Sequence, residues 1–321
     1  MPRPVDDVSA PSEQVAKRAV PTGHPRLRFP VRPIMGRWPG WLEALIGRVW
    51  TDPAAMFDPA APDEVFAKAV GAVELGGTFK ITQPDRHAAC DDLLLDHVPL
   101  AGATIVDIGA SDGSTSVDLI ARLPADFAAY VIADRYLEVQ AAHVGGCTLL
   151  FDPDDGRCIL AFGKRWLAWP HRSRAIRLAC SPLLVAERVG RRQRASVPLL
   201  NPRARALVAA DPRVTVRVHD VFRPWDGPRP DVVKVANLLR RVYFDDDQIQ
   251  AALDAIRTSL PEGGHLLVVD NPYLPIDARA GLYRREGDRF ALVALTAEVP
   301  EINDLVLHHD PDAAVGRQEV P

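Results

Sequence analysis

The sequence has few of the features that define several protein classes. Its 321 residues include only four cysteines, Cys90, Cys147, Cys158 and Cys180, and none of them form the C-x-x-C pairs of a structural zinc site. No apolar run approaches the roughly 18 residues that a membrane span needs, and the first residues contain no signal-peptide core. The net charge of −4 does not point to a polyanion partner. We therefore expect a cytoplasmic globular protein with reduced thiols and no metal site.

A glycine turn joins an apolar segment to a helical pattern in the stretch TIVDIGASDGSTSVDLI, residues 104–120. The β-branched residues before the turn favour a buried strand, and Gly109 and Gly113 allow the backbone to turn tightly and approach a ligand. The turn lacks the second and third glycines of G-x-G-x-x-G, and Asp112 within it would repel a pyrophosphate. A dinucleotide is therefore not the expected ligand.

The same residues resemble motif I of the class I S-adenosylmethionine-dependent methyltransferases. Asp107, Gly109 and Gly113 occupy three positions of that family's D-x-G-x-G-x-G pattern, and Ser111 replaces the middle glycine. The resemblance implies that these four residues contact the cofactor S-adenosylmethionine.

Two more acidic residues follow apolar segments. Asp134 ends the run AAYVIAD and lies 21 positions after Gly113, where an open α/β sheet places an acid beside a ribose. Its two oxygens would suit two hydroxyl donors. Asp220 follows the alternating segment at residues 214–218. The resemblance implies that Asp220 accepts a hydrogen bond from the adenine amino group and that Val221 offers its backbone N–H to the ring. A strand-end Asp that only caps a turn is the alternative.

A fourth apolar segment, residues 231–236, is followed by Asn237 and Tyr243, and then by a long helical pattern, a P-x-G-G turn and another apolar segment. This order resembles the fourth motif of the same methyltransferases, including those that modify glutamate in chemotaxis receptors. We place Asn237 and Tyr243, as candidate catalytic residues, near the transferred methyl group, together with His219 and Tyr273; Asn237 is also a candidate cofactor contact.

The expected fold is a doubly wound, Rossmann-like α/β fold with a seven-stranded methyltransferase sheet, an N-terminal helical cap and an inserted basic lobe. Prolines predict a disordered N-terminal tail, and the segment WLEALIGRVW predicts a short amphipathic cap helix. In chain order we expect a tail at residues 1–35 and a cap at residues 36–99. The cofactor domain should follow in two parts, residues 100–142 and 201–309, with the lobe between them at residues 143–200. A second tail should form residues 310–321.

The expected lobe explains an unusual spacing. Asp134 and Asp220 are 86 positions apart, more than one helix and two loops require. We expect an insertion after residues 136–139, at roughly residues 143–200, that follows the second strand's helix. It should contain a hairpin around residues 152–156 and a helix interrupted near Pro182.

The lobe is strongly basic. From Arg157 to Arg205 there are twelve Lys or Arg residues and one acidic residue, Glu187, which indicates an anionic partner. A small or lipid-like acid ranks above RNA, because no RNA-binding signature is present. A solvated arginine-rich face is the alternative. The candidate substrate contacts are Arg191, Arg192, Arg194 and Tyr273.

The sequence thus predicts an S-adenosylmethionine-dependent methyltransferase that acts on an anionic small-molecule or lipid-like acceptor. The sulfonium of that cofactor already activates the methyl group, so the protein mainly aligns the acceptor. One alternative is a protein or RNA methyltransferase. Another is a non-catalytic module of the same fold that binds a partner through the basic lobe, although the intact Asp107, Asp134 and Asp220 argue against it.

Overall fold

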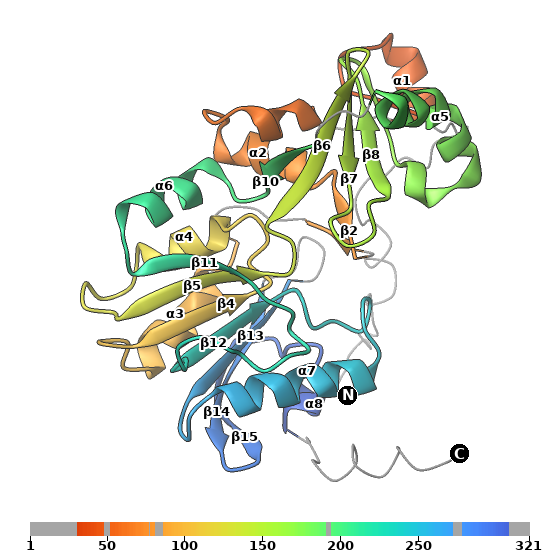
Figure 1. Ribbon diagram of the computed structural model, residues 1–321. Helices are drawn as coiled ribbons and strands as arrows, with labels where there is room; N and C mark the ends of the chain where they lie inside the picture. The colour runs from red at the N-terminus through yellow and green to blue at the C-terminus, as the bar shows by residue number, and fades with distance from the viewer. Residues whose placement is uncertain are drawn as a thin grey trace, which may run out of the picture.

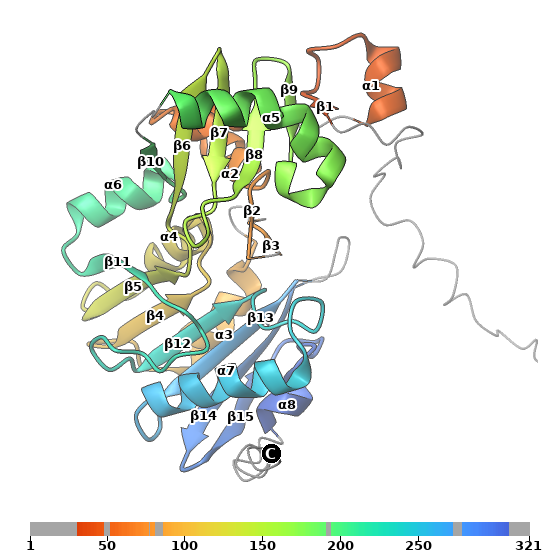
Figure 2. The same cartoon turned by 45° about the vertical axis from the view of Figure 1, so that its right-hand side comes forward.

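The computed structural model describes residues 31–47, 52–76, 78–80, 86–190, 194–271 and 278–307. In these ranges the chain forms a seven-stranded sheet, a six-stranded sheet and a two-stranded ribbon (Figure 1). The ribbon pairs β2 (Glu74–Leu75) with β3 (Thr78–Phe79) and lies between the two larger sheets (Figure 2). None of the helices in the described ranges combines the length and the hydropathy that a membrane crossing requires.

The seven-stranded sheet is parallel over its first five strands and antiparallel at one edge. In spatial order its strands are β11 (Val214–Val218), β5 (Ala129–Asp134), β4 (Thr104–Ile108), β12 (Val232–Ala236), β13 (His265–Asp270), β14 (Arg279–Glu286) and β15 (Arg289–Leu295). The chain runs outward from β4 in one direction through β5 and β11, and in the other through β12 and β13. The strand order therefore reverses between β4 and β12, which is the point where open α/β sheets bind ligands.

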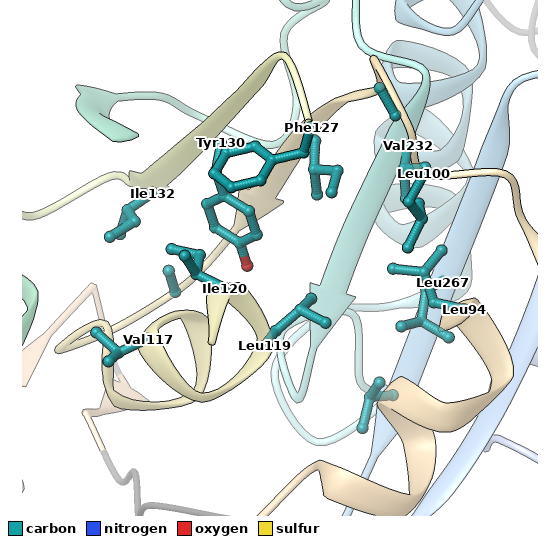
Figure 3. Close-up of a cluster of buried hydrophobic side chains, with 14 of the residues drawn as sticks. Leu94, Leu100, Val117, Leu119, Ile120, Phe127, Tyr130, Ile132, Val232 and Leu267 are labelled. Atoms are coloured by element: carbon teal, nitrogen blue, oxygen red, sulfur yellow. The ribbon is translucent and has the colours of Figure 1, made fainter. Parts of the chain in front are cut away.

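Helices cover both faces of this sheet (Figure 1). One face packs against α3 (Ala88–His97), α4 (Ser114–Ile120) and α6 (Pro202–Ala210), and the other against α7 (Asp246–Ser259) and α8 (Asn303–Leu307). Figure 3 shows the first core, in which Leu94 and Leu119 from the helices meet Tyr130 from β5. The expected seven-stranded Rossmann-like sheet is confirmed.

The six-stranded sheet is antiparallel throughout. In spatial order its strands are β1 (Arg32–Pro33), β9 (Trp166–Ala168), β8 (Cys158–Phe162), β7 (Cys147–Phe151), β6 (Glu138–Val144) and β10 (Ala195–Pro198). One face packs against α5 (Arg174–Val189), which follows the short 3-10 helix η3 (Pro170–Arg172). The other face packs against the 3-10 helix η2 (Pro53–Phe57) and α2 (Asp63–Val70).

The insertion begins differently from the prediction. No helix forms at residues 136–139; β6 starts at Glu138, because Val139 and Ala141 are buried while Glu138 and Gln140 are exposed, an alternation that suits a strand. The helix that leads to β11 is α6, so the insertion precedes the crossover helix instead of following it.

The helix expected to break at Pro182 is continuous through that residue to Val189. Proline cannot donate to the carbonyl of Leu178 four residues earlier, but the hydroxyl of Ser181 donates to this carbonyl at 2.7 Å. The lost backbone bond is thus replaced locally.

The N-terminal segment does not form one cap. Its first short helix, α1 (Gly40–Ile46), follows β1, and η2 and α2 pack on the six-stranded sheet, whereas α3 packs on the seven-stranded sheet. Of the expected first tail, residues 1–30 lie outside the described residues, and residues 32–33 form β1, which pairs with β9. The expected second tail, residues 310–321, also lies outside them.

Candidate functional site

A cavity of about 210 Å³ lies at the carboxyl ends of the parallel strands. Residues from the turns after β4, β5, β11, β12 and β13 line it, together with residues between β2 and α3. Nine of the residues singled out in the sequence are among them: Asp107, Gly109, Ser111, Asp134, His219, Asp220, Val221, Asn237 and Tyr243. The cavity therefore occupies the switch point of the sheet.

The turn after β4 needs a left-handed backbone at two cavity positions. Gly109 has φ +77°, and a Cβ there would lie 2.8 Å from Cδ2 of Leu238. Ser111 has φ +60° although it is not glycine, so it keeps the backbone of the glycine that it replaces in the motif. Its N–H donates to Oδ2 of Asp134 at 2.8 Å. Its buried Oγ has no hydrogen-bond partner among the described residues.

Two other residues of this turn serve packing. Gly113 does not line the cavity; with φ +79° it precedes α4, and a Cβ there would lie 3.0 Å from Cβ of Ala204 on α6. The expectation that it contacts the cofactor gains no support. Asp112 is fully buried and accepts hydrogen bonds from the N–H and Oγ of Ser114, both at 2.9 Å. It does not line the cavity, so the argument that it would repel a pyrophosphate was wrong.

Asp107 belongs to a buried polar cluster beneath the cavity. Its Oδ2 accepts from Oγ of Ser116 at 2.7 Å and from the hydroxyl of Tyr130 at 3.0 Å. Burial and the nearby carboxylates raise the pKa of Tyr130 well above its usual value, so the phenol remains a donor. On β12, the fully buried Lys234 donates to Asp91 at 2.7 Å. Burial alone would lower the pKa of Lys234, but Asp91 and Asp107 outweigh that effect and raise it.

Asp134 is already engaged by three donors. Its Oδ1 accepts from Nζ of Lys80 at 2.7 Å and from the N–H of Tyr136 at 2.9 Å, and its Oδ2 accepts from Ser111. A carboxylate offers about four acceptor positions, so about one remains for a ribose hydroxyl. The buried Lys80 was missed by sequence reasoning, since it stands in no motif and follows a segment far from β5.

The turn after β11 is more open. Asp220 has a side chain 30% exposed, accepts from the N–H of Phe222 at 3.2 Å and lies 3.5 Å from Nη1 of Arg135. The neighbouring His219 packs its ring edge-on against Trp225 at a centroid distance of 4.9 Å, and burial lowers its pKa. Asp220 is thus the acid of this site with the greatest capacity for another donor.

Three polar side chains form a network at the ends of β12 and β13. Asn237, with φ +56°, accepts at Oδ1 from the backbone N–H of Asn271 at 2.6 Å. Its Nδ2 lies 2.8 Å from Oδ1 of Asn271 and 3.2 Å from Nε2 of His87. His87, which is buried and lines the cavity, was also missed, because it precedes α3 and belongs to no recognised pattern.

Of the predicted substrate contacts, only Arg194 belongs to the described residues. Arg194 does not line the cavity: its guanidinium lies 3.6 Å from the ring centroid of Phe151 and pairs with Glu187 at 3.0 Å. Arg191, Arg192 and Tyr273 lie outside the described residues. Other arginines of the basic segment are also paired, such as Arg172 with Glu74, so acids elsewhere in the fold compensate part of the charge. The described residues contain no group of three or more His, Cys, Asp or Glu side chains that could hold a metal ion.

The solved structures that match this chain include S-adenosylmethionine-dependent methyltransferases, as the motifs predicted. The chain is 16% identical to the methyltransferase SibL, 18% to the mitomycin 7-O-methyltransferase MmcR and 12% to human N-acetylserotonin methyltransferase in complex with S-adenosylmethionine. The matches cover 57%, 68% and 57% of this chain but only 36%, 42% and 34% of those chains, with TM-scores of 0.30, 0.29 and 0.30. No family model and no curated protein matches the sequence.

At this level of similarity the matches carry no argument about substrate or mechanism. The fold class rests on the strand order itself: the protein has a Rossmann-like α/β fold whose switch point opens into the cavity.

Proposed function

We propose that the protein is an S-adenosylmethionine-dependent methyltransferase that acts on an anionic small-molecule or lipid-like acceptor. The observation that carries the proposal is the convergence of Ser111, Asp134, Asp220 and Asn237 in one cavity from the ends of four parallel strands. Each of these residues belongs to a different motif of the sequence and lies at or just after the end of a different strand.

The residues present fit the cofactor. Ser111 offers a buried hydroxyl with no partner among the described residues, Asp134 retains about one acceptor position, and Asp220 is partly exposed beside the backbone of Val221. These groups would hold the nucleoside part over β5 and β11. When bound, S-adenosylmethionine supplies a methyl group that its sulfonium activates. Asn237 and Tyr243 would then orient the acceptor at the β12 end of the cavity.

The anionic nature of the acceptor is supported by the cations of the cavity. Lys80, Arg86, Arg135 and Arg240 all line it. Three of them also pair with acids: Lys80 with Asp134, Arg135 with Asp220 and Arg240 with Asp270.

Calorimetry with S-adenosylhomocysteine tests the cofactor assignment. We expect saturable binding that Asp134→Ala weakens by about 1–3 kcal/mol, the usual loss when a buried polar contact is removed. Arg194→Ser, at the residue that precedes β10, is the control and should bind as the wild type does. A wild-type protein that binds NAD but not S-adenosylhomocysteine would overturn the proposal. Labelled cofactor incubated with fractionated cell extract would then identify the acceptor class, including protein or RNA.

One observation favours a second function, a non-catalytic module of this fold. Lys80 occupies an oxygen of Asp134 that would otherwise face a ribose. If neither NAD nor S-adenosylhomocysteine binds in calorimetry, the ion pair of Lys80 and Asp134 takes the place of a cofactor contact. The protein is then better described as a non-catalytic module.

A further inference from the structure

The orientation of the Asn237 amide is determined by the backbone. The N–H of Asn271 can only donate, and it lies 2.6 Å from one terminal atom of the Asn237 side chain. That atom must therefore be the oxygen, so the other terminal atom is the nitrogen. The nitrogen has two hydrogens and two neighbours, Oδ1 of Asn271 at 2.8 Å and Nε2 of His87 at 3.2 Å.

This orientation determines the tautomer of His87. Because the amide nitrogen of Asn237 donates to Nε2, that ring nitrogen must carry a lone pair, and a neutral imidazole then carries its proton on Nδ1. Burial, together with the positive charges of Lys234 and Arg86, lowers the pKa of His87 well below its usual value, so the ring is neutral.

The proton on Nδ1 has no recipient within the part of the chain that the structure describes. Nδ1 of His87 is buried and has no hydrogen-bond partner among the described residues, while the ring lines the cavity. A buried N–H without an acceptor is rare in native proteins, so each case calls for a partner. The partner that this position calls for is an acceptor atom, such as an oxygen of a ligand.

Among the described residues, the end of the cavity near His87 and Asn237 has no group suited to deprotonate an acceptor. Nε2 of His87 already accepts from Asn237, and Asp107 is buried and accepts two hydrogen bonds. The imidazole of His219 follows β11, which is three strand positions from β12 and so roughly 14 Å away. An acceptor that is already anionic at neutral pH needs no base, and a carboxylate meets that condition where a phenol, an alcohol or an ammonium does not.

We propose that the methyl acceptor is a carboxylic acid and that the Nδ1–H of His87 binds one oxygen of its carboxylate. The proposal rests on the methyltransferase function proposed above. The second oxygen attacks the methyl carbon, an O–C bond forms as the C–S bond breaks, and the electron pair of that bond remains on sulfur. No proton moves, and the products are a methyl ester and S-adenosylhomocysteine. His87 thus holds the oxygen that does not react, so its hydrogen bond does not compete with the attack.

The tautomer is tested by long-range ¹H–¹⁵N NMR of the full chain with labelled histidine, in which His87→Gln assigns the signal by its disappearance. We expect His87 to be neutral and protonated on Nδ1 from pH 6 to 8. An imidazolium, or a ring protonated on Nε2, would overturn the proposal.

The oxyanion is tested by titrating the same sample with sodium benzoate, in the presence of excess S-adenosylhomocysteine. We expect a saturable downfield shift of the Nδ1 proton with benzoate and none with benzyl alcohol, which has the same ring but no charge. Equal responses to the two compounds, or no response to benzoate, refute the assignment.

Variants separate the donor from the bulk of the ring. His87→Asn retains an N–H near the position of Nδ1 and should bind benzoate within about threefold of wild type, whereas His87→Leu should lose at least tenfold. His97→Leu on the exposed end of α3 is the matched control. If His87→Leu does not fold, the wild-type NMR spectra still test both the tautomer of His87 and its response to benzoate. Calorimetry distinguishes the two proposals. If the wild type does not bind S-adenosylhomocysteine, the proposed methyltransferase function is wrong. If it binds S-adenosylhomocysteine but shows no response to benzoate, only the proposed role of His87 is wrong.

Discussion

The buried pair between Lys80 and Asp134 provides the most direct test of the site's construction. Their side chains are only 7% and 10% exposed, and their N–O distance is 2.7 Å. Lys80→Met removes the ammonium and leaves the carboxylate with only its two backbone donors, Ser111 and Tyr136. Breaking a buried ion pair by removing one partner typically costs about 3–5 kcal/mol, because the remaining charge is uncompensated.

Urea denaturation gives the measurement. With a slope of about 3 kcal/mol per molar for a chain of this size, the midpoint of Lys80→Met should fall by roughly 1–1.7 M while the slope stays constant. The double variant Lys80→Met with Asp134→Asn removes both charges and keeps an acceptor oxygen for one of the two backbone donors. It should therefore be more stable than the sum of the single variants predicts, by about 1–3 kcal/mol.

The matched control is Lys68→Met. Lys68 forms an exposed pair with Glu64 at 3.8 Å, with side chains 61% and 76% exposed, and such pairs contribute about 0.5 kcal/mol or less. If Lys80→Met is as stable as Lys68→Met, the ammonium is not buried against Asp134, and the account of the ribose-binding end of the cavity is wrong.

Three further predictions follow from single contacts. Gly109→Ala should destabilise the protein by about 1–3 kcal/mol in denaturant titrations, because of its positive φ and the contact with Leu238; a neutral effect would contradict the described turn. Ser111→Gly keeps the left-handed backbone, so its stability should change by less than about 1 kcal/mol, while calorimetry should show weaker binding of S-adenosylhomocysteine; unchanged affinity would exclude a contact with Oγ. Burial opposes the ionisation of Glu74, but Arg172 and His171 outweigh it and lower its pKa. Since a lowered carboxyl pKa stabilises the folded state above the unfolded-state pKa, the stability lost in Glu74→Gln should be present at pH 7 and disappear as the pH falls below about 4; a pH-independent loss would refute the pairing.

The residues at the strand ends could be predicted because their signals are local. Each apolar segment predicts a strand, and the parallel order brings the carboxyl ends of the strands to one edge of the sheet. Asp134, Asp220 and Asn237 could therefore be predicted as cavity residues without knowledge of their contacts. The departure at Ser111 was also visible, although its left-handed backbone was not.

Lys80 and His87 could not be predicted in this way. Both come from the segment before β4, and only the packing of α2 and α3 on different sheets carries that segment across the cavity. A single lysine or histidine in a loop has no periodicity, and its function depends on groups more than fifty positions away, such as Asp134 and Asn237. The start of the insertion was predicted near residue 143, whereas β6 already begins at Glu138, because no helix separates it from β5.

The division of the N-terminal segment between the two sheets has a consequence for folding. Ile34, Phe66 and Val70, which come from before β4, share a buried cluster with Val139 and Leu150 of the six-stranded sheet. That sheet therefore closes around a part of the chain that is synthesised well before five of its six strands, β6 to β10. Deletion of residues 138–200 would expose the apolar sides of η2 and α2 and release the anchor of the segment that carries Lys80 and His87. The inserted sheet is thus not a detachable module. The cavity can form only after contacts between residues distant in sequence have formed in both sheets. We therefore expect the cavity to be lost when either sheet first unfolds cooperatively.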